Sequence, residues 1–158
     1  YQPTDGKPGQ VCILNNGGLR ASLPAGNITR GNVYELMPFD NEIVVVTITG
    51  AKMWELVKFA AASGGVPIAG MSIGLKPDKT PGKVLVGGVP FDSTQTYKVI
   101  TSDYLANGGD KMAFLKNPIS NEKTGYLIRN AILDTFADAQ KMGKTIAPVT
   151  DRRMHYEN

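Results

Sequence analysis

The segment 101–110 contains an aromatic ring and a carboxylate that could together bind a ligand. Tyr104 and Asp110 stand six positions apart and are joined by an Asn-Gly-Gly turn. Glycine accepts positive φ at no steric cost and asparagine tolerates it, so this loop can bring the ring beside the carboxylate. A flat aromatic face next to a hydrogen-bond acceptor suits a purine base. The same residues also fit an ordinary turn, because turn chemistry accounts for both glycines.

Two other loops carry side chains that could complete such a site. The run Asn-Asn-Gly-Gly-Leu-Arg at 15–20 follows a predicted strand, where ligand loops are common, and Arg20 offers a planar fork for phosphate or carboxylate. Pro38 fixes the backbone beside Phe39, so that ring can be presented rigidly. A hairpin turn with a solvent-facing arginine, and a core phenylalanine, explain each feature alone. Together they indicate a nucleotide clamp, in which each stacked ring is worth about 1–3 kcal/mol.

Composition narrows the possible chemistry. The 158 residues fit one domain, with 42% hydrophobic and 20% charged residues as in ordinary globular proteins. The single Cys12 rules out an internal disulfide or thiolate cluster, and its apolar strand predicts a small core thiol. The single His155 lies near the end of the sequence, which disfavours a His-rich metal centre and a serine triad. We therefore expect no catalytic residue and no metal ligand in this chain.

Charge and hydropathy exclude further classes. The net charge is +3, but lysines and arginines are scattered, whereas a nucleic-acid face normally clusters them. We expect no nucleic acid polymer as a partner. No apolar run approaches the roughly 20 residues that span a bilayer, so no membrane span is expected. The sequence starts at Tyr1 with neither initiator Met nor signal peptide, which suggests a processed protein or an excised domain.

Strands and helices alternate along the chain. The Pro/Gly-rich residues 1–10 are predicted to be a flexible lead-in to one domain over 11–158. Ile128, Ile132 and Phe136 share one face of the last predicted helix. The predicted class is α+β, a single compact domain with mixed β-sheets flanked by helices. Strands are predicted at 11–14, 42–49, 70–75, 83–86 and 97–101, and helices at 32–36 (capped by Thr29), 51–63 and 123–142.

Several of these segments, in this order, resemble the 5'-nucleotidase C-terminal domain, a family that includes bacterial 5'-nucleotidases, UDP-sugar hydrolases and animal ecto-5'-nucleotidases. The resemblance runs from about residue 11 to about 115 and is carried by segments 15–20, 28–31, 34–41, 97–99 and 104–110. In that family a separate N-terminal metallophosphoesterase domain, with two metal ions, performs the hydrolysis. The C-terminal domain binds the nucleoside and rotates to deliver the phosphate.

The resemblance assigns roles to individual residues. Arg20 matches the arginine on the phosphate side, and Asn15 its neighbour in the base and ribose pocket. Phe39 and Tyr104 match two aromatics that sandwich the base; Tyr104 replaces a frequent Phe, which keeps the stack and adds a hydroxyl for hydrogen bonding. The remaining matches are Asp110 on the ribose hydroxyls and, from less distinctive surroundings, Asn41 and Gly70.

One family feature has no counterpart here. Family members carry a helix with a Gly-Asn-Leu signature before the first strand, and it contributes another substrate arginine. We expect that segment to have been removed or to be supplied by another polypeptide. Arg30 is predicted to be a surface residue near a helix start rather than its substitute.

Three hypotheses follow. The first is the substrate-binding domain of a 5'-nucleotidase-type hydrolase for AMP-like nucleotides, working with a metallophosphoesterase domain in cis or in trans. That domain would hold divalent metals of the Zn, Mn or Co type, and the family implies a periplasmic, secreted or cell-surface location. The second is a free-standing, non-catalytic nucleotide- or nucleoside-binding protein. The third is a structural relic whose pocket is no longer used.

Overall fold

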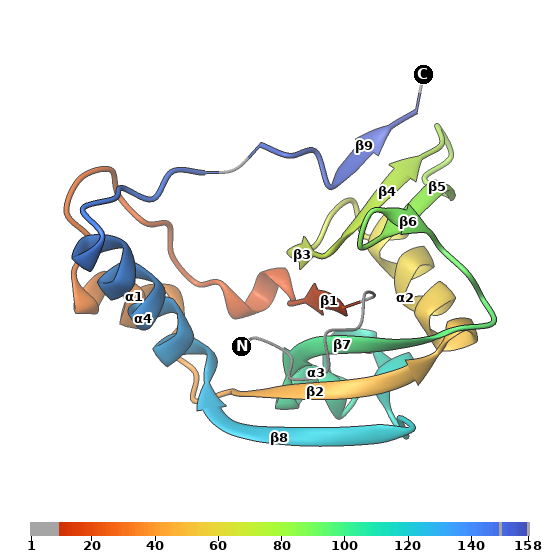
Figure 1. The fold of residues 1–158 in the computed structure, drawn as a ribbon, viewed down its shortest axis with the longest axis horizontal. Helices are drawn as coiled ribbons and strands as arrows, with labels where there is room; N and C mark the ends of the chain where they lie inside the picture. Colours follow the sequence, from red (N-terminus) through yellow and green to blue (C-terminus); the bar gives the residue numbers. More distant parts are fainter. Residues whose placement is uncertain (1–9, 149, 158) are drawn as a thin grey trace.

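The computed structural model describes residues 10–148 and 150–157, and its chain forms two sheets with helices around them (Figure 1). One sheet has the strand order β3-β1-β7-β2-β8, and the other has the order β6-β5-β4-β9. We call them the first and the second sheet. The strands of the first sheet are β1 (Gln10–Ile13), β2 (Glu42–Thr49), β3 (Ile68–Ala69), β7 (Thr96–Ser102) and β8 (Ser120–Leu127). Those of the second are β4 (Met71–Leu75), β5 (Pro81–Val86), β6 (Val89–Pro90) and β9 (Met154–Tyr156).

Both parallel and antiparallel pairs occur within each sheet. In the first sheet β1 runs parallel to β7, whereas β2 is antiparallel to β7 and β8. In the second, β4 is parallel to β9 and antiparallel to β5. Mixed sheets with helices outside them confirm the predicted α+β class. The helices are α1 (Arg30–Leu36), α2 (Gly50–Ala62), α3 (Asp103–Ala106) and α4 (Ile128–Lys141).

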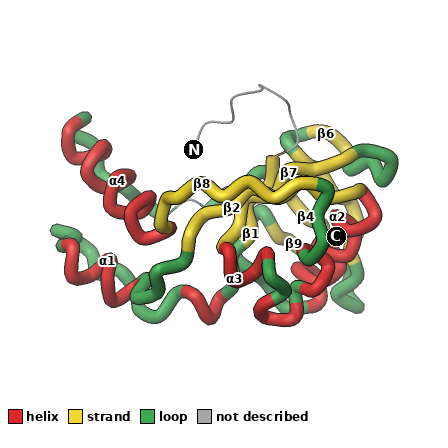
Figure 2. Tube along the Cα trace, turned by 90° about the horizontal axis from the view of Figure 1, so that it is seen from below, coloured by secondary structure: helices red, strands yellow, loops and turns green. Residues whose placement is uncertain are grey.

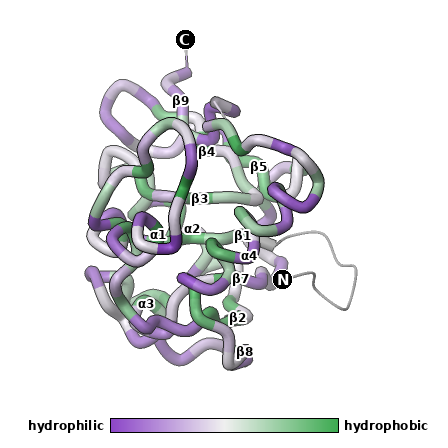
Figure 3. The backbone as a smooth tube through the Cα atoms, turned by 90° about the vertical axis from the view of Figure 1, so that its left-hand side faces the viewer, coloured by the Kyte–Doolittle hydropathy of each residue, from purple (hydrophilic) through white to green (hydrophobic). Residues whose placement is uncertain are grey.

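The core lies where α2 packs against strands of both sheets. Met53, Leu56 and Val57 are fully buried on α2, as the helical spacing predicts. They join Val46 and Ile48 of β2 in one continuous cluster of buried residues. Figure 3 shows hydrophobic residues gathered along the inner strands and α2, with hydrophilic residues in the outer loops.

The two remaining longer elements form an arm. Helices α1 and α4 lie side by side at the end of the molecule away from α2 (Figures 1 and 2). Thr29 caps α1 as predicted, because its hydroxyl accepts the Asn32 backbone N–H at 3.2 Å. Arg30 is exposed at the first position of this helix, in agreement with its predicted surface role. Within the described residues, no helix is both long and apolar enough to cross a membrane.

The predicted helix over 123–142 is wrong in its first part. Residues 120–127 form β8, which pairs with β2, and the helix begins only at Ile128. Gly125 has φ of 67°, a value incompatible with helix continuation, and the polar run before it pairs with a long central strand instead. Ile128 is buried and Ile132 and Phe136 are half-buried, so the predicted helical face holds over the remainder.

Both ends of the chain differ in detail from expectation. Gln10, assigned to the lead-in, already belongs to β1, and residues 1–9 lie outside the described part of the chain. At the other end, 154–156 form strand β9, where no strand was predicted. Cys12 is half-buried in β1, where burial raises the pKa of its thiol and the nearby Arg153 charge partly opposes this. Cys12 is not among the buried core residues, which include its neighbours Val11 and Ile13, so the predicted core position holds only in part.

Candidate functional site

Three loops that carry predicted site residues begin or end at the same end of the strands in the first sheet. We call these loops, 14–20, 37–41 and 103–112, the loop cluster. Ile43 of β2 pairs with Ser102 of β7, and Cys12 of β1 pairs with Ile100 in parallel. The carboxyl ends of β1 and β7 and the beginning of β2 therefore meet at the same edge. Loops 14–20, 37–41 and 103–112 begin or end there. The buried Thr101 hydroxyl donates to the Ile13 carbonyl at 2.8 Å and fastens two of these strand ends together.

The loop after β7 folds back on itself, so that Tyr104 meets Asp110. The Tyr104 hydroxyl donates to Asp110 Oδ1 at 3.1 Å and accepts the Asp110 backbone N–H at 3.3 Å. Gly108 takes the left-handed conformation that the turn requires, with φ of 88°. Asp110 itself also has φ of 48°, which asparagine and aspartate tolerate better than most residues. The predicted approach of ring and carboxylate is confirmed.

The loop after β1 joins this pair through Asn15. The Asn15 side-chain amide donates to Asp110 Oδ2 across 95 positions of sequence. The absence of a side chain at Gly18 leaves room for the Asn15 side chain, since a Cβ at position 18 would lie 2.8 Å from Asn15 Oδ1. The carboxylate of Asp110 thus accepts from an amide on one side and a phenol on the other. Both donors come from predicted site residues.

Phe39 and Arg20 lie on neighbouring segments around α1. The Arg20 backbone N–H donates to the Leu36 carbonyl at 2.8 Å, which ties the loop after β1 to the last turn of that helix. The Arg20 side chain is exposed. Phe39 follows three residues after Leu36, and its side chain is 43% exposed, while that of Tyr104 is 48% exposed. Half-exposed rings on a protein surface leave apolar area available to a ligand.

Asn41 connects the Phe39 segment to the Tyr104 loop. Its amide donates to Asp103 Oδ1 at 2.9 Å, and the same oxygen accepts the Tyr104 backbone N–H at 2.8 Å. One carboxylate therefore links the two segments that carry the aromatic rings. Sequence reasoning did not identify Asp103, although its place directly before Tyr104 and after the N-cap Ser102 was visible.

A cavity of about 290 Å³ opens beside the loop cluster. Asn15 and Asp110 line it, together with apolar side chains of Phe59, Val66 and Met112. The other predicted site residues lie outside this lining: Arg20, Phe39, Asn41, Gly70 and Tyr104. The cavity therefore adjoins one side of the Asp110 carboxylate.

Gly70 is not brought together with the other predicted site residues. It forms the turn between β3 and β4 with φ of 77°, and its carbonyl accepts the Gly87 N–H at 2.8 Å. It lines a separate cavity of about 270 Å³ against the second sheet, with Asp151 and Arg153 among its neighbours. Its positive φ accounts for the glycine by turn geometry alone.

Arg129 is a second residue that sequence reasoning missed. It is buried, at 8% exposure, and forms an ion pair with Asp40. No sequence signal pointed to it, because its partner Asp40 lies 89 positions away along the chain. Among the described residues, no group of three or more His, Cys, Asp and Glu side chains is placed to hold a metal ion.

Comparison with known proteins shows the family to which this chain belongs. Residues 3–117 match the family described as 5'-nucleotidase, C-terminal domain. Protein UshA of Escherichia coli is 31% identical over 120 residues, which cover 73% of this chain and 22% of UshA. The trifunctional nucleotide phosphoesterase protein YfkN of Bacillus subtilis is 25% identical over 160 residues, covering 92% of this chain and 11% of YfkN.

A solved structure agrees with these relatives. The 5'-nucleotidase precursor from Thermus thermophilus superimposes with a TM-score of 0.78 and 28% identity, over 95% of this chain and 32% of that one. The chain thus spans between 11% and 32% of the length of these three proteins. The family match covers most of the chain, and the fold agrees over nearly all of it. This chain belongs to the 5'-nucleotidase C-terminal domain family.

Proposed function

We propose that this chain is the nucleotide-binding part of a 5'-nucleotidase-type hydrolase. The base of an AMP-like nucleotide stacks between Phe39 and Tyr104, and the ribose hydroxyls bond to Asp110 beside Asn15. Arg20 faces the phosphate. The observation that carries this proposal is the convergence of three loops at one sheet edge, with two half-exposed rings and a hydrogen-bonded carboxylate among them.

Hydrolysis is proposed to occur on a separate metallophosphoesterase domain, in cis or in trans, that holds divalent metals. The described side chains do not fit such a metal centre, so we assign no step to a metal held by this chain. Its own contribution is binding and orientation. Holding a phosphate in reactive geometry can itself account for a large share of a rate enhancement. We also propose a periplasmic, secreted or cell-surface location, which agrees with a snake venom 5'-nucleotidase from Naja atra being 26% identical.

Calorimetric titration of the 158-residue chain with AMP, adenosine and inorganic phosphate tests the binding role. We expect AMP to bind with a Kd on the order of micromolar, adenosine more weakly and phosphate alone weakest, because stacking supplies most of the affinity. Absence of heat with both AMP and adenosine, from protein shown to be folded, would contradict the proposal.

A hydrolysis assay tests the division of labour. AMP incubated with this chain and a divalent metal is expected to release no phosphate, and addition of the metallophosphoesterase domain is expected to start the reaction. Turnover by this chain alone would contradict a purely binding role. Binding without any gain on addition of that domain would favour a free-standing nucleotide-binding protein instead.

The Gly109→Ala variant offers a local test of Tyr104. A Cβ at position 109 would lie 2.5 Å from Cε1 and Cζ of the Tyr104 ring, so the ring must move. We expect AMP affinity to fall about tenfold, which is within the range of one stacking contact. In a Tyr104→Ala background the same substitution should have little further effect, since no ring remains to be displaced. Equal losses in both backgrounds would show that the clash with the ring is not the cause.

A further inference from the structure

Arg129 is the buried charged side chain among the residues whose burial the structure describes, and it lies outside the range that matches the family. A buried guanidinium is costly unless hydrogen bonds and an opposite charge compensate it. Its location in the first turn of α4 places it against the end of α1 and the segment that follows. The contacts that compensate its burial therefore indicate what it does.

Among the described residues, the hydrogen bonds and the ion pair of Arg129 go to one short segment, 37–40. Nη1 faces the carbonyls of Met37, Pro38 and Phe39 at 3.3, 3.2 and 3.4 Å. Nη2 pairs with the carboxylate of Asp40. Three successive carbonyls and the next side chain thus curl around a single planar group, a geometry that the rigid fork of arginine can satisfy and a single ammonium cannot reproduce.

In addition to these hydrogen bonds, one face of the guanidinium packs against an aromatic ring. Its central carbon lies 4.3 Å from the centroid of the Tyr34 ring, a cation–π distance. Nε is buried and has no hydrogen-bond partner among the described residues, so the group is anchored through its two terminal nitrogens. Asp40 is 76% exposed, whereas the Arg129 side chain is 10% exposed. The arginine is therefore the buried member of this ion pair, and Asp40 is the exposed one.

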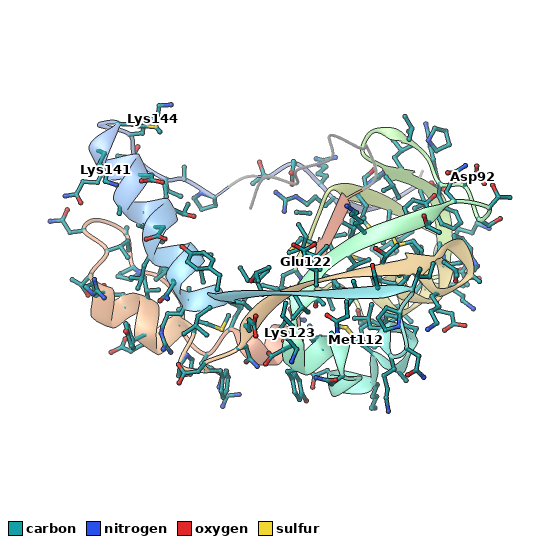
Figure 4. The ribbon with its side chains drawn as sticks, turned by 60° about the horizontal axis from the view of Figure 1, so that its bottom comes forward. Asp92, Met112, Glu122, Lys123, Lys141 and Lys144 are labelled. Atoms are coloured by element: carbon teal, nitrogen blue, oxygen red, sulfur yellow. The ribbon has the colours of Figure 1, made fainter. Side chains whose placement is uncertain are left out.

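The start of α4 also contacts Asn41, the residue that follows segment 37–40. The Ile128 N–H donates to the Asn41 carbonyl at 3.0 Å, and the Asn41 amide donates to Asp103, directly before Tyr104. Contacts from α4 therefore fix both sides of Phe39 and continue to the second aromatic ring. The opposite end of this helix, at Lys141, and Lys144 just beyond it extend away from both sheets (Figure 4).

We propose that Arg129 is a positioning residue for nucleotide binding, which fixes segment 37–40 and so presents Phe39 in the orientation that stacks on the base. This inference rests on the proposed function. Arg129 does not touch the nucleotide in this scheme and acts through the backbone that carries Phe39. Its loss should therefore weaken binding of the nucleoside part and leave the phosphate contribution of Arg20 intact.

The test compares Arg129→Met with Arg153→Met. Arg153 is a matched control, because its guanidinium also holds a backbone carbonyl, that of Ile68 at 2.6 Å, and a nearby carboxylate, Asp151 at 2.7 Å. Arg153 joins Ile68 of β3 in the first sheet to the segment that leads into β9 of the second sheet, and neither of these two contacts involves segment 37–40. Arg129→Met is expected to weaken adenosine and AMP by the same factor, about tenfold, because one of two stacking contacts is lost. Arg153→Met is expected to change both by less than twofold.

A measurement on the ligand-free protein keeps this inference separate from the proposed function. The chain has five phenylalanines, so fluorophenylalanine labelling should give five 19F resonances, with that of Phe39 assigned by its loss in Phe39→Leu. We expect the Phe39 resonance to shift or broaden in Arg129→Met and to stay unchanged in Arg153→Met. If wild-type protein binds no nucleotide, the proposed function fails while this readout still reports on Arg129.

Two milder variants cover the case in which Arg129→Met does not fold. Arg129→Lys keeps the charge but not the fork, and Asp40→Asn removes the ion pair at an exposed side chain. Both are expected to perturb the Phe39 resonance, and Arg129→Lys to weaken adenosine and AMP equally. A Phe39 resonance and affinities unchanged from wild type in folded Arg129 variants would overturn the inference. A loss confined to AMP would overturn it too, because it would make Arg129 a phosphate contact.

Discussion

The double variant Phe39→Ala/Tyr104→Ala is expected to lose most of its AMP affinity while the chain stays folded. Each stacked ring is worth about 1–3 kcal/mol, and a micromolar Kd corresponds to about 8 kcal/mol, so removal of both should raise the Kd by about 100- to 10,000-fold, to roughly 0.1–10 mM. Each single variant should lose about 10- to 100-fold on the same basis. Both rings are about half-exposed, so their truncation should cost less stability than the loss of a core aromatic.

Calorimetry with AMP, beside chemical unfolding of each variant, checks this result. Tyr156→Ala is the matched control, because Tyr156 is an exposed aromatic, at 61%, on the second sheet. Tyr104→Phe keeps the ring and loses only the hydroxyl contact to Asp110, so it should retain most of the affinity. An AMP affinity in the double variant equal to that of wild type would rule out the base stack. A loss in only one single variant would indicate stacking on one face.

Features that depend on a few adjacent residues could be predicted from the sequence. The β-branched run at 42–49 forms β2, the apolar spacing at 51–63 forms α2, and Thr29 caps α1. The fold of the Tyr104 loop also follows from local chemistry, because Gly108 takes the positive φ that its turn needs. In each of these cases the neighbours along the chain determine the backbone, and tertiary packing reinforces the same choice.

Features that depend on distant pairing could not be predicted from physical patterns alone. The contact of Asn15 with Asp110 joins residues 95 positions apart, and it exists because β1 lies parallel to β7. The parallel register has no local signature. The Asn41 and Asp103 link likewise follows from the pairing of β2 with β7. Family resemblance selected most of these residues, and strand pairing explains why they meet.

The error at β8 shows how pairing overrides a local pattern. The helical spacing holds from Ile128 onward. Residues before it form β8 instead, because Gly125 takes a positive φ and the segment pairs with the side of β2 that faces away from β7. β8 and α4 lie beyond residue 117, where the family match ends, yet β8 completes the first sheet and α4 supplies Arg129. The structural unit that supports the candidate site is therefore larger than the matching sequence segment. Truncation near residue 117 would expose β2 and release segment 37–40.

A second large effect is expected from Gly50→Ala, on stability rather than binding. Gly50 is buried at the start of α2, and a Cβ there would lie 2.1 Å from the Ser93 carbonyl oxygen. That backbone cannot easily yield, because Asp92 accepts hydrogen bonds from Thr94 and adjoins Phe91, which stacks between Trp54 and Tyr97. Overpacking of this kind costs about 2–3 kcal/mol, which lowers Tm by about 5–10 °C for a domain of this size.

Thermal and urea unfolding of Gly50→Ala and Gly31→Ala provides the comparison. Gly31 lies in the first turn of α1, where a Cβ would make only an ordinary 3.5 Å contact with the Thr29 hydroxyl. Alanine favours helix over glycine by about 1 kcal/mol, so Gly31→Ala should be neutral or slightly stabilising. A Gly50→Ala variant as stable as wild type would mean that loop 91–95 shifts freely. The aromatic stack and the Asp92 turn would then not hold the loop against α2.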